Sequence, residues 1–172
     1  MRTLETPRLR LAPVASDDFD ALYAVYSEPE VSRFLTTQPR SREEFGRVFE
    51  QMIELSSTLG MWTIVHKADD RPIGRCGFYP YSGPPAAAPE LAYLLSQAYW
   101  SKGLATEAAE CCLDFAFRVQ GWPEVVAMVR PENLLSVRVL TKIGMQRLRR
   151  ITVRGIPADL YQMSSGPCRT TC

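Results

Sequence analysis

The chain has 172 residues, of which 46% are hydrophobic and 23% charged, a composition typical of one globular domain with a full core. Its formal net charge is only +1, so it lacks the basic excess with which nucleic-acid-binding proteins contact phosphates. No apolar stretch approaches the roughly 20 residues that a membrane span needs, and the N-terminal residues do not resemble a secretion signal. We therefore expect a cytoplasmic protein without nucleic-acid or membrane partners; its oligomeric state is not encoded in any readable pattern, and a homodimer stays open.

The five cysteines form no Cys-x-x-Cys pair, which is typical of reduced thiols, and a single histidine cannot complete a zinc site with them. We expect no metal. Cys168 and Cys172 lie in a segment rich in Ser, Gly, Pro and Thr. The sequence thus predicts one domain over residues 1–164 and a flexible tail over 165–172.

The first half of the chain alternates strand and helix signals. A short strand is expected over 9–12, followed by a helix that Ser16 can cap and that ends before Pro29. Ser41 and Glu44 form a capping box for a second helix that ends at Gly60. Residues 61–66 and 73–79 then read as two strands of an antiparallel hairpin.

The second half predicts a βαβ unit followed by a hairpin. A loop over 79–89 either borders a site or is a plain surface excursion. The remaining expected elements are a strand over 90–95, a helix over 104–119, a strand over 125–129, a helix over 134–143 capped by Asn133, and strands over 145–153 and 158–163. These elements indicate a mixed α/β fold with about seven strands.

A short polar turn with one glycine, WSKGLA at 100–105, joins the strand over 90–95 to the following helix. Amide groups in the first turn of a helix lack internal partners, and the helix dipole places partial positive charge there. Such a turn can bind a diphosphate. A plain strand-to-helix connection, in which Gly103 only relieves backbone strain, explains the same residues equally well.

A second motif, Asn133-x-x-Ser136, follows the neighbouring strand and should face the same cleft. Together with the turn at 100–105, it resembles the two signature motifs of the GNAT N-acetyltransferase superfamily, in particular the branch of ribosomal-protein N-terminal (Rim-type) acetyltransferases. Two positions depart from that pattern. Trp100 replaces the usual Gln or Arg, and Leu140 stands where many relatives place a tyrosine acid.

The resemblance covers nearly the whole chain and implies a single GNAT-like domain, mixed α/β, with a central splayed sheet flanked by helices. It also implies acetyl-CoA as the acyl-donor cosubstrate. In this resemblance Ser101 to Thr106 hold the diphosphate, the backbone of Leu94 and Leu95 pairs with the pantetheine arm, and Asn133 holds cofactor or cleft backbone. The implied cofactor-binding residues are Leu94, Leu95, Ser101, Lys102, Gly103, Leu104, Ala105, Thr106 and Asn133.

Glu90 resembles the carboxylate that relatives use as a base, directly or through water, although a solvated carboxylate at the end of a strand is an equal alternative. Ser136 is the candidate proton donor to the leaving thiolate; its other interpretation is capping or packing on a short helix. His66, the only histidine, is expected to be structural. Cys76 shows no sign of thiolate activation, so direct transfer is expected rather than a covalent relay.

The sequence as a whole predicts an acetyl-CoA-dependent N-acetyltransferase that acts on a primary amine, either a protein N-terminus or a small amine. The alternative is a non-catalytic acyl-CoA-binding sensor, which the departures at Trp100 and Leu140 keep open. Four arginines near the C-terminus, at 147, 149, 150 and 154, could attract an acidic substrate; a solvated strand face is the plainer interpretation.

Overall fold

The computed structural model describes residues 1–35, 38–39, 41–81, 83 and 88–165. Its strands are β1 (Leu4–Glu5), β2 (Leu9–Pro13), β3 (Met61–His66), β4 (Arg71–Pro80), β5 (Pro89–Leu95), β6 (Glu124–Val129), β7 (Gln146–Val153) and β8 (Ile156–Ser164). Its α-helices are α1 (Phe19–Tyr26), α2 (Pro29–Ser32), α3 (Arg42–Ser57), α4 (Leu104–Asp114) and α5 (Leu134–Lys142). Short 3₁₀-helices at Ser16–Asp18 and Gln97–Tyr99 and a π-helix at Phe115–Val119 complete the described elements.

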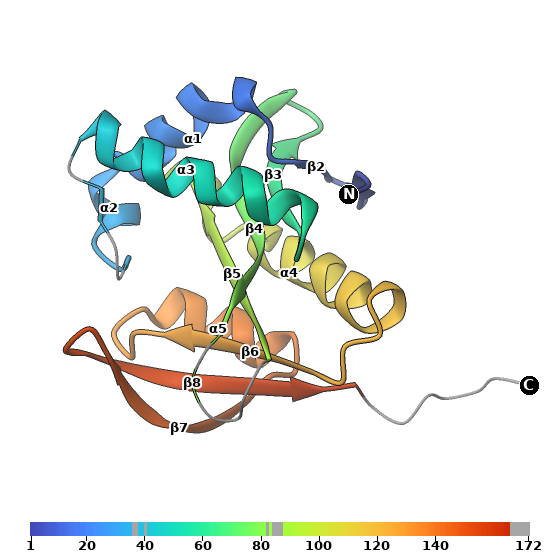
Figure 1. Ribbon diagram of the computed structural model, residues 1–172, viewed down its shortest axis with the longest axis vertical. Helices are drawn as coiled ribbons and strands as arrows, with labels where there is room; N and C mark the ends of the chain where they lie inside the picture. Colours follow the sequence, from blue (N-terminus) through green and yellow to red (C-terminus); the bar gives the residue numbers. More distant parts are fainter. Residues whose placement is uncertain (36–37, 40, 82, 84–87, 166–172) are drawn as a thin grey trace, which may run out of the picture.

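The strands form one mixed sheet in the order β1-β2-β3-β4-β5-β6-β8-β7. All neighbours pair antiparallel except β5 and β6, which are parallel and share a single register pair, Glu90 with Val126. The sheet therefore divides into two halves that touch near Glu90 and diverge beyond it. In Figure 1, β5 and β6 cross at the centre of the molecule, with α1–α3 at one end and α5, β7 and β8 at the other.

Two apolar clusters hold the helices to opposite faces of the sheet. The larger joins α4 to β2–β6 and includes Trp62, Phe78 and Cys112, all fully buried. The second joins α1 and α3 to the other face through Phe45, Met52 and their neighbours. Both faces of the β4–β5 pair are thus covered, and the space left between the halves is the main hollow of the described structure.

Most of the predicted elements are confirmed with the expected ends. The Ser41 hydroxyl accepts a hydrogen bond from the Glu44 amide at 3.1 Å, as the capping box requires. Asn133 caps α5 in the same way, accepting from the Ser136 amide at 3.2 Å. Gly60 and Gly144 follow their helices with φ of 101° and 86°, a region in which glycine has no side-chain penalty.

The expected sheet of about seven strands is confirmed; it has eight, because the two-residue β1 is too short to show a periodic pattern in the sequence. Other expectations were wrong in detail. Ser16 does not cap a helix; the Asp18 carboxylate instead accepts from the Ala15 amide at 3.0 Å. The loop starts after Pro80 rather than at Tyr79, since β4 and β5 stay paired to their ends. The helix expected over 104–119 is confirmed; it is an α-helix to Asp114 and continues as a π-helix over Phe115–Val119.

The C-terminal end of the predicted domain lies just beyond β8. The Ser165 amide donates to the Pro123 carbonyl at 2.9 Å, which fixes the chain just beyond β8. Residues 166–172, with Cys168 and Cys172, lie outside the described residues. Within the described part of the chain, no helix is both long and apolar enough to cross a bilayer.

Candidate active site

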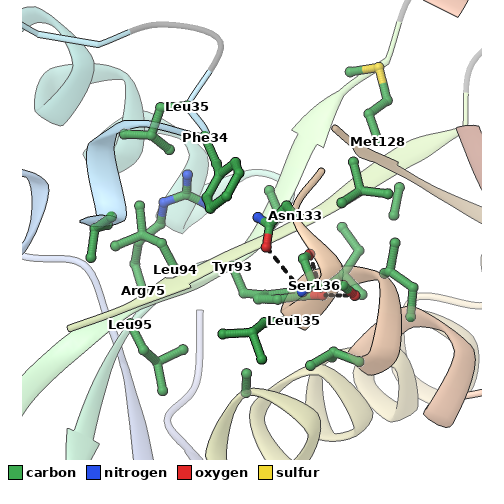
Figure 2. A pocket seen from close by; sticks show the side chains of 18 of the residues that line it. Phe34, Leu35, Arg75, Tyr93, Leu94, Leu95, Met128, Asn133, Leu135 and Ser136 are labelled. Atoms are coloured by element: carbon green, nitrogen blue, oxygen red, sulfur yellow. Dashed lines mark hydrogen bonds between the residues drawn. The ribbon is translucent and has the colours of Figure 1, made fainter. Parts of the chain in front are cut away.

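A cavity of about 780 Å³ occupies the space between the two halves of the sheet. It is lined by both diverging strands, by the turn before α4, by the first turns of α5 and by the segment that follows α2. Glu90, Leu94, Leu95, Asn133 and Ser136 all line it, so residues that are far apart in sequence meet here as predicted. Figure 2 shows Phe34, Leu35 and Arg75 on one side of this cavity and Asn133 and Ser136 on the other.

The turn before α4 has the backbone geometry of an anion site. Ser101 and Gly103 both lie in the left-handed region, with φ of 59° and 78°. The first internal bond at this end of the helix runs from the Glu107 amide to the Gly103 carbonyl, which leaves the three preceding amides, 104–106, without an internal partner. Ser101, Gly103 and residues 104–106 line the cavity, whereas Lys102 does not. The Lys102 ammonium instead lies 5.3 Å from the centre of the Tyr99 ring.

Arg8, the residue before β2, holds this turn in place and was not among the predicted site residues. Its Nη1 donates to the Lys102 carbonyl at 2.9 Å, and its Nη2 pairs with the Glu107 carboxylate at 2.7 Å. The same carboxylate accepts from the Arg8 amide and the Thr6 hydroxyl, and these hydrogen bonds hold the pKa of Glu107 below its usual value despite partial burial. Nothing in the local pattern links residue 8 to residue 107, because their contact is set by the packing of β2 against α4.

Trp100, the departure at the head of the turn, has a structural role of its own. Its indole Nε1 donates to the Leu95 carbonyl at 2.7 Å, so the ring ties the turn back to the end of β5. This bond fixes the strand end on which the expected pantetheine contact depends. Leu140, the second departure, is buried with 1% of its surface exposed and offers the cavity only an apolar wall.

Glu90 lies inside the cavity, where β5 and β6 part. Burial raises the pKa of its carboxyl to about 7, and the nearby charge of Arg75 opposes this rise. The solvated strand-end interpretation does not agree with this placement. A carboxylate that titrates near neutral pH can take up a proton and release it again under ordinary conditions.

Tyr93 places a phenolic hydroxyl beside Ser136, a contact that the sequence did not reveal. The two hydroxyl oxygens are 2.9 Å apart, and the phenol also lies 3.2 Å from the Ser136 carbonyl (Figure 2). Burial raises the pKa of Tyr93, so the phenol stays protonated at neutral pH. Tyr93 comes from β5 and Ser136 from the first turn of α5, so this contact joins the two elements.

Two other candidates from the sequence lie elsewhere. His66 pairs with Asp69 at 2.7 Å and packs 5.3 Å from the Tyr99 ring, a structural role as expected. Cys76 is fully buried beneath α4 and does not line the cavity. The described residues contain no cluster of three or more His, Cys, Asp or Glu side chains with metal-binding geometry.

The chain matches the model of the acetyltransferase (GNAT) domain family over residues 8–146. It is 32% identical over 150 residues to the Bacillus licheniformis protein named "Uncharacterized N-acetyltransferase p20", covering 86% of this chain and 84% of that one. A GNAT-family acetyltransferase from Bacillus anthracis has the same fold, with a TM-score of 0.82, 20% identity and coverage of 95% and 99% of the two chains. RimL, the ribosomal L7/L12 alpha-N-protein acetyltransferase, solved in complex with coenzyme A, superposes with a TM-score of 0.79 at 15% identity, covering 95% and 98%.

This chain therefore belongs to the GNAT acetyltransferase family, whose fold uses acetyl-CoA. Its structural neighbours include ribosomal-protein acetyltransferases, which share its fold. It is an enzyme of that family.

Proposed function

We propose that this enzyme transfers the acetyl group of acetyl-CoA directly to the nitrogen of a primary amine, with Glu90 as the base. The observation that carries the proposal is the position of Glu90, inside the cavity where the sheet opens, with a pKa of about 7. Few acidic side chains in a protein are balanced between charged and neutral at this pH.

The residues present fit acetyl-CoA. The free amides at 104–106 and the turn held by Arg8 suit a diphosphate, and the open edge of β5 beyond Glu90 suits an amide-rich arm that pairs as an added strand. We assign cofactor binding to the residues named from the sequence, with Lys102 contributing its backbone rather than its side chain. Asn133 acts indirectly, by fixing the start of α5 through its cap.

When bound, acetyl-CoA supplies a thioester whose C–S bond breaks as the C–N bond to the acceptor forms. Glu90 takes the proton that the amine loses, directly or through water. The Tyr93 hydroxyl, hydrogen-bonded to Ser136, gives a proton to the departing sulfur, so that the thiol leaves neutral. Ser136 thus acts beside Tyr93 rather than alone, because a serine hydroxyl is the poorer acid.

The acceptor is a protein N-terminus or a small amine. An α-amino group with a pKa near 7.8 costs about 1 kcal/mol to deprotonate at pH 7, whereas a lysine near 10.4 costs about 4.6 kcal/mol. A single carboxylate such as Glu90 is sufficient for the first and weak for the second. Location in the cytoplasm stays a prediction from the sequence.

The experiment is mass spectrometry of a mixture of small amines and N-terminal peptides after incubation with isotopically labelled acetyl-CoA. We expect labelled acetyl groups on amine nitrogen, and Glu90→Gln should slow the reaction by about 10²- to 10⁴-fold with little change in acetyl-CoA affinity. Binding of acetyl-CoA without any labelled product would instead support the non-catalytic sensor.

A further inference from the structure

Arg75, in the middle of β4, is a buried charge with an incomplete set of partners. Its side chain is almost fully enclosed, with 6% of its surface exposed. The guanidinium Nε donates to the Tyr26 hydroxyl at 2.9 Å, and the Tyr79 ring lies 5.2 Å from its central carbon. Nη1 is buried and has no hydrogen-bond partner among the described residues.

Arg75 belongs to none of the ion pairs among the described residues, although its charge acts on the Glu90 carboxyl. An arginine cannot lose its proton, so a buried guanidinium with a free N–H group carries an unmet demand for an acceptor. Natural structures rarely leave such a group unpaired unless a ligand completes it.

The strand register places Arg75 on the same face as the proposed base. Residues directly opposite each other in an antiparallel pair share a face, and side chains alternate along each strand. Arg75 pairs with Leu94 and Tyr79 pairs with Glu90, so these four side chains face one way. All four line the cavity.

The wall beside Arg75 in this half of the cavity is apolar. It is formed by Val31, Phe34 and Leu35, from α2 and the residues that follow it. Figure 2 shows the Phe34 ring and the Arg75 guanidinium on the same side of the cavity. A second guanidinium, that of Arg130, lies 5.9 Å from the Phe34 ring and pairs with the Glu132 carboxylate at 3.7 Å.

We propose, on the basis of the acetyl transfer inferred above, that the acceptor amine also bears a carboxylate, which Arg75 binds while Glu90 faces the nitrogen. Guanidinium and carboxylate form short, charge-assisted hydrogen bonds, and the free Nη1 supplies the missing donor. The apolar wall suits an acceptor with a hydrophobic body, such as an aromatic or aliphatic amino acid. The charge of Arg75 disfavours polyamines, which carry only positive charge.

The test compares matched acceptors in a coenzyme A release assay: phenylalanine, phenylalaninamide, and C-terminally amidated dipeptides with or without an acidic second residue. The α-amino group of phenylalaninamide is less basic than that of phenylalanine, so a larger fraction of it is neutral and reactive at a given pH. A preference for phenylalanine therefore cannot come from its amino group. We expect kcat/KM about 10- to 100-fold higher for phenylalanine than for its amide. A preference for the acidic dipeptide over both would assign the carboxylate to a peptide side chain, still at Arg75.

Variants assign the preference to Arg75. Arg75→Gln should bring the ratio of kcat/KM for phenylalanine to that for phenylalaninamide close to one, and Arg75→Lys should keep part of the preference. A merely structural role of Arg75 would lower the rates with both acceptors together. Arg118→Gln is the matched control, since the Arg118 side chain is 81% exposed and does not line the cavity. If Arg75→Gln does not fold, the ratio of kcat/KM for phenylalanine to that for phenylalaninamide in the wild-type enzyme decides whether the acceptor needs a carboxylate.

A second measurement separates this inference from the proposed function. Calorimetry with coenzyme A present should detect N-acetylphenylalanine and not its amide. Equal kcat/KM for acid and amide would overturn the inference while leaving acetyl transfer established. No coenzyme A release with any amine would overturn the proposed function, and calorimetry would then still show whether Arg75 holds a carboxylate.

Discussion

Glu90 shows how a single buried side chain links activity to stability. Its pKa in the folded protein is about 7, above the ordinary value of 4.5, because burial penalises the charged form. A raised carboxyl pKa stabilises the fold below pH 4.5, and this stability is lost as the pH rises through 7. Glu90→Gln should therefore raise the free energy of unfolding at pH 8 by on the order of 1 kcal/mol, and with it the melting temperature, and have little effect at pH 4. Calorimetric melting of both proteins at the two pH values checks this; an equal shift at both would contradict the assigned burial.

Tyr93 and Ser136 should act as one unit. Tyr93→Phe removes the phenol that lies 2.9 Å from the Ser136 hydroxyl, and we expect kcat to fall about 10²-fold with acetyl-CoA affinity nearly unchanged. Adding Ser136→Ala should cost less than the sum of the single changes, since both remove the same proton path. Steady-state kinetics of the four proteins measure this. Tyr23→Phe, outside the cavity, is the control; full additivity would mean that the two hydroxyls act independently.

Sequence reasoning found the site residues that belong to local motifs and missed those that depend on the packing of distant strands. Glu90 and Ser136 were named from the sequence, but neither the burial of Glu90 nor the partner of Ser136 could be read from it. Tyr93 and Arg75 looked like ordinary strand residues. They face opposite sides of the sheet, and both line the cavity because the sheet opens between β5 and β6.

At the scale of elements, the turn before α4 should depend on the conformation of Gly103. Its φ of 78° costs other residues roughly 1–2 kcal/mol, while an added Cβ would meet only Arg8 Nη2 at an ordinary 3.5 Å. Gly103→Ala should therefore lower stability by about that amount and raise KM for acetyl-CoA several-fold. Gly121→Ala is the matched control, because φ there is 67° and the space is open. It should lose similar stability without any change in KM; a KM change in both would mean a general effect of strain.

Element ends were predictable because their causes are local. The Ser41 and Asn133 caps and the glycines at 60 and 144 each act within a few residues, and all four are confirmed. Failures came where a distant segment decides the outcome. Asp18, for example, is used by both the Ala15 amide and the Thr63 hydroxyl of β3, and this contact displaces the cap expected at Ser16.

At the scale of the whole molecule, Asp159 fastens the edge strand β7 to β8. Its nearly buried carboxylate pairs with Arg147 at 2.8 Å and Arg150 at 3.0 Å, so two of the four arginines that looked solvated have a structural role. These hydrogen bonds hold the pKa of Asp159 well below its usual value. The stability they supply is present above pH 3.8 and is lost as the pH falls through the folded-state pKa.

Asp159→Asn should consequently lower the melting temperature by several degrees at pH 7, and the difference should shrink as the pH falls below 3.8. Urea or thermal unfolding across pH 2.5–7 measures it. Asp114→Asn, at an exposed ion pair with Arg118, is the control and should have little effect. A difference that persists unchanged at the lowest pH would show that the ion pairs are not its source.

The mixed sheet follows from the order of helices and strands, but the position of its opening does not. Composition and periodicity predicted a βαβ unit, and that unit is β5–α4–β6. Whether its parallel strands pair along their length or at one point depends on how α4 and α5 pack, which no local pattern records. Only the family resemblance implied a splayed sheet, and the single register pair at Glu90 confirms it.

The most direct test of acetyl transfer with Glu90 as base is the ratio of wild-type to Glu90→Gln rates of coenzyme A release, measured from pH 5.5 to 8.5 with one amine. Titration of the amine cancels in this ratio. We predict that it rises about tenfold per pH unit below 7, where Glu90 becomes charged, and levels off above. A ratio that stays near one at every pH would contradict the assignment of Glu90 as the base.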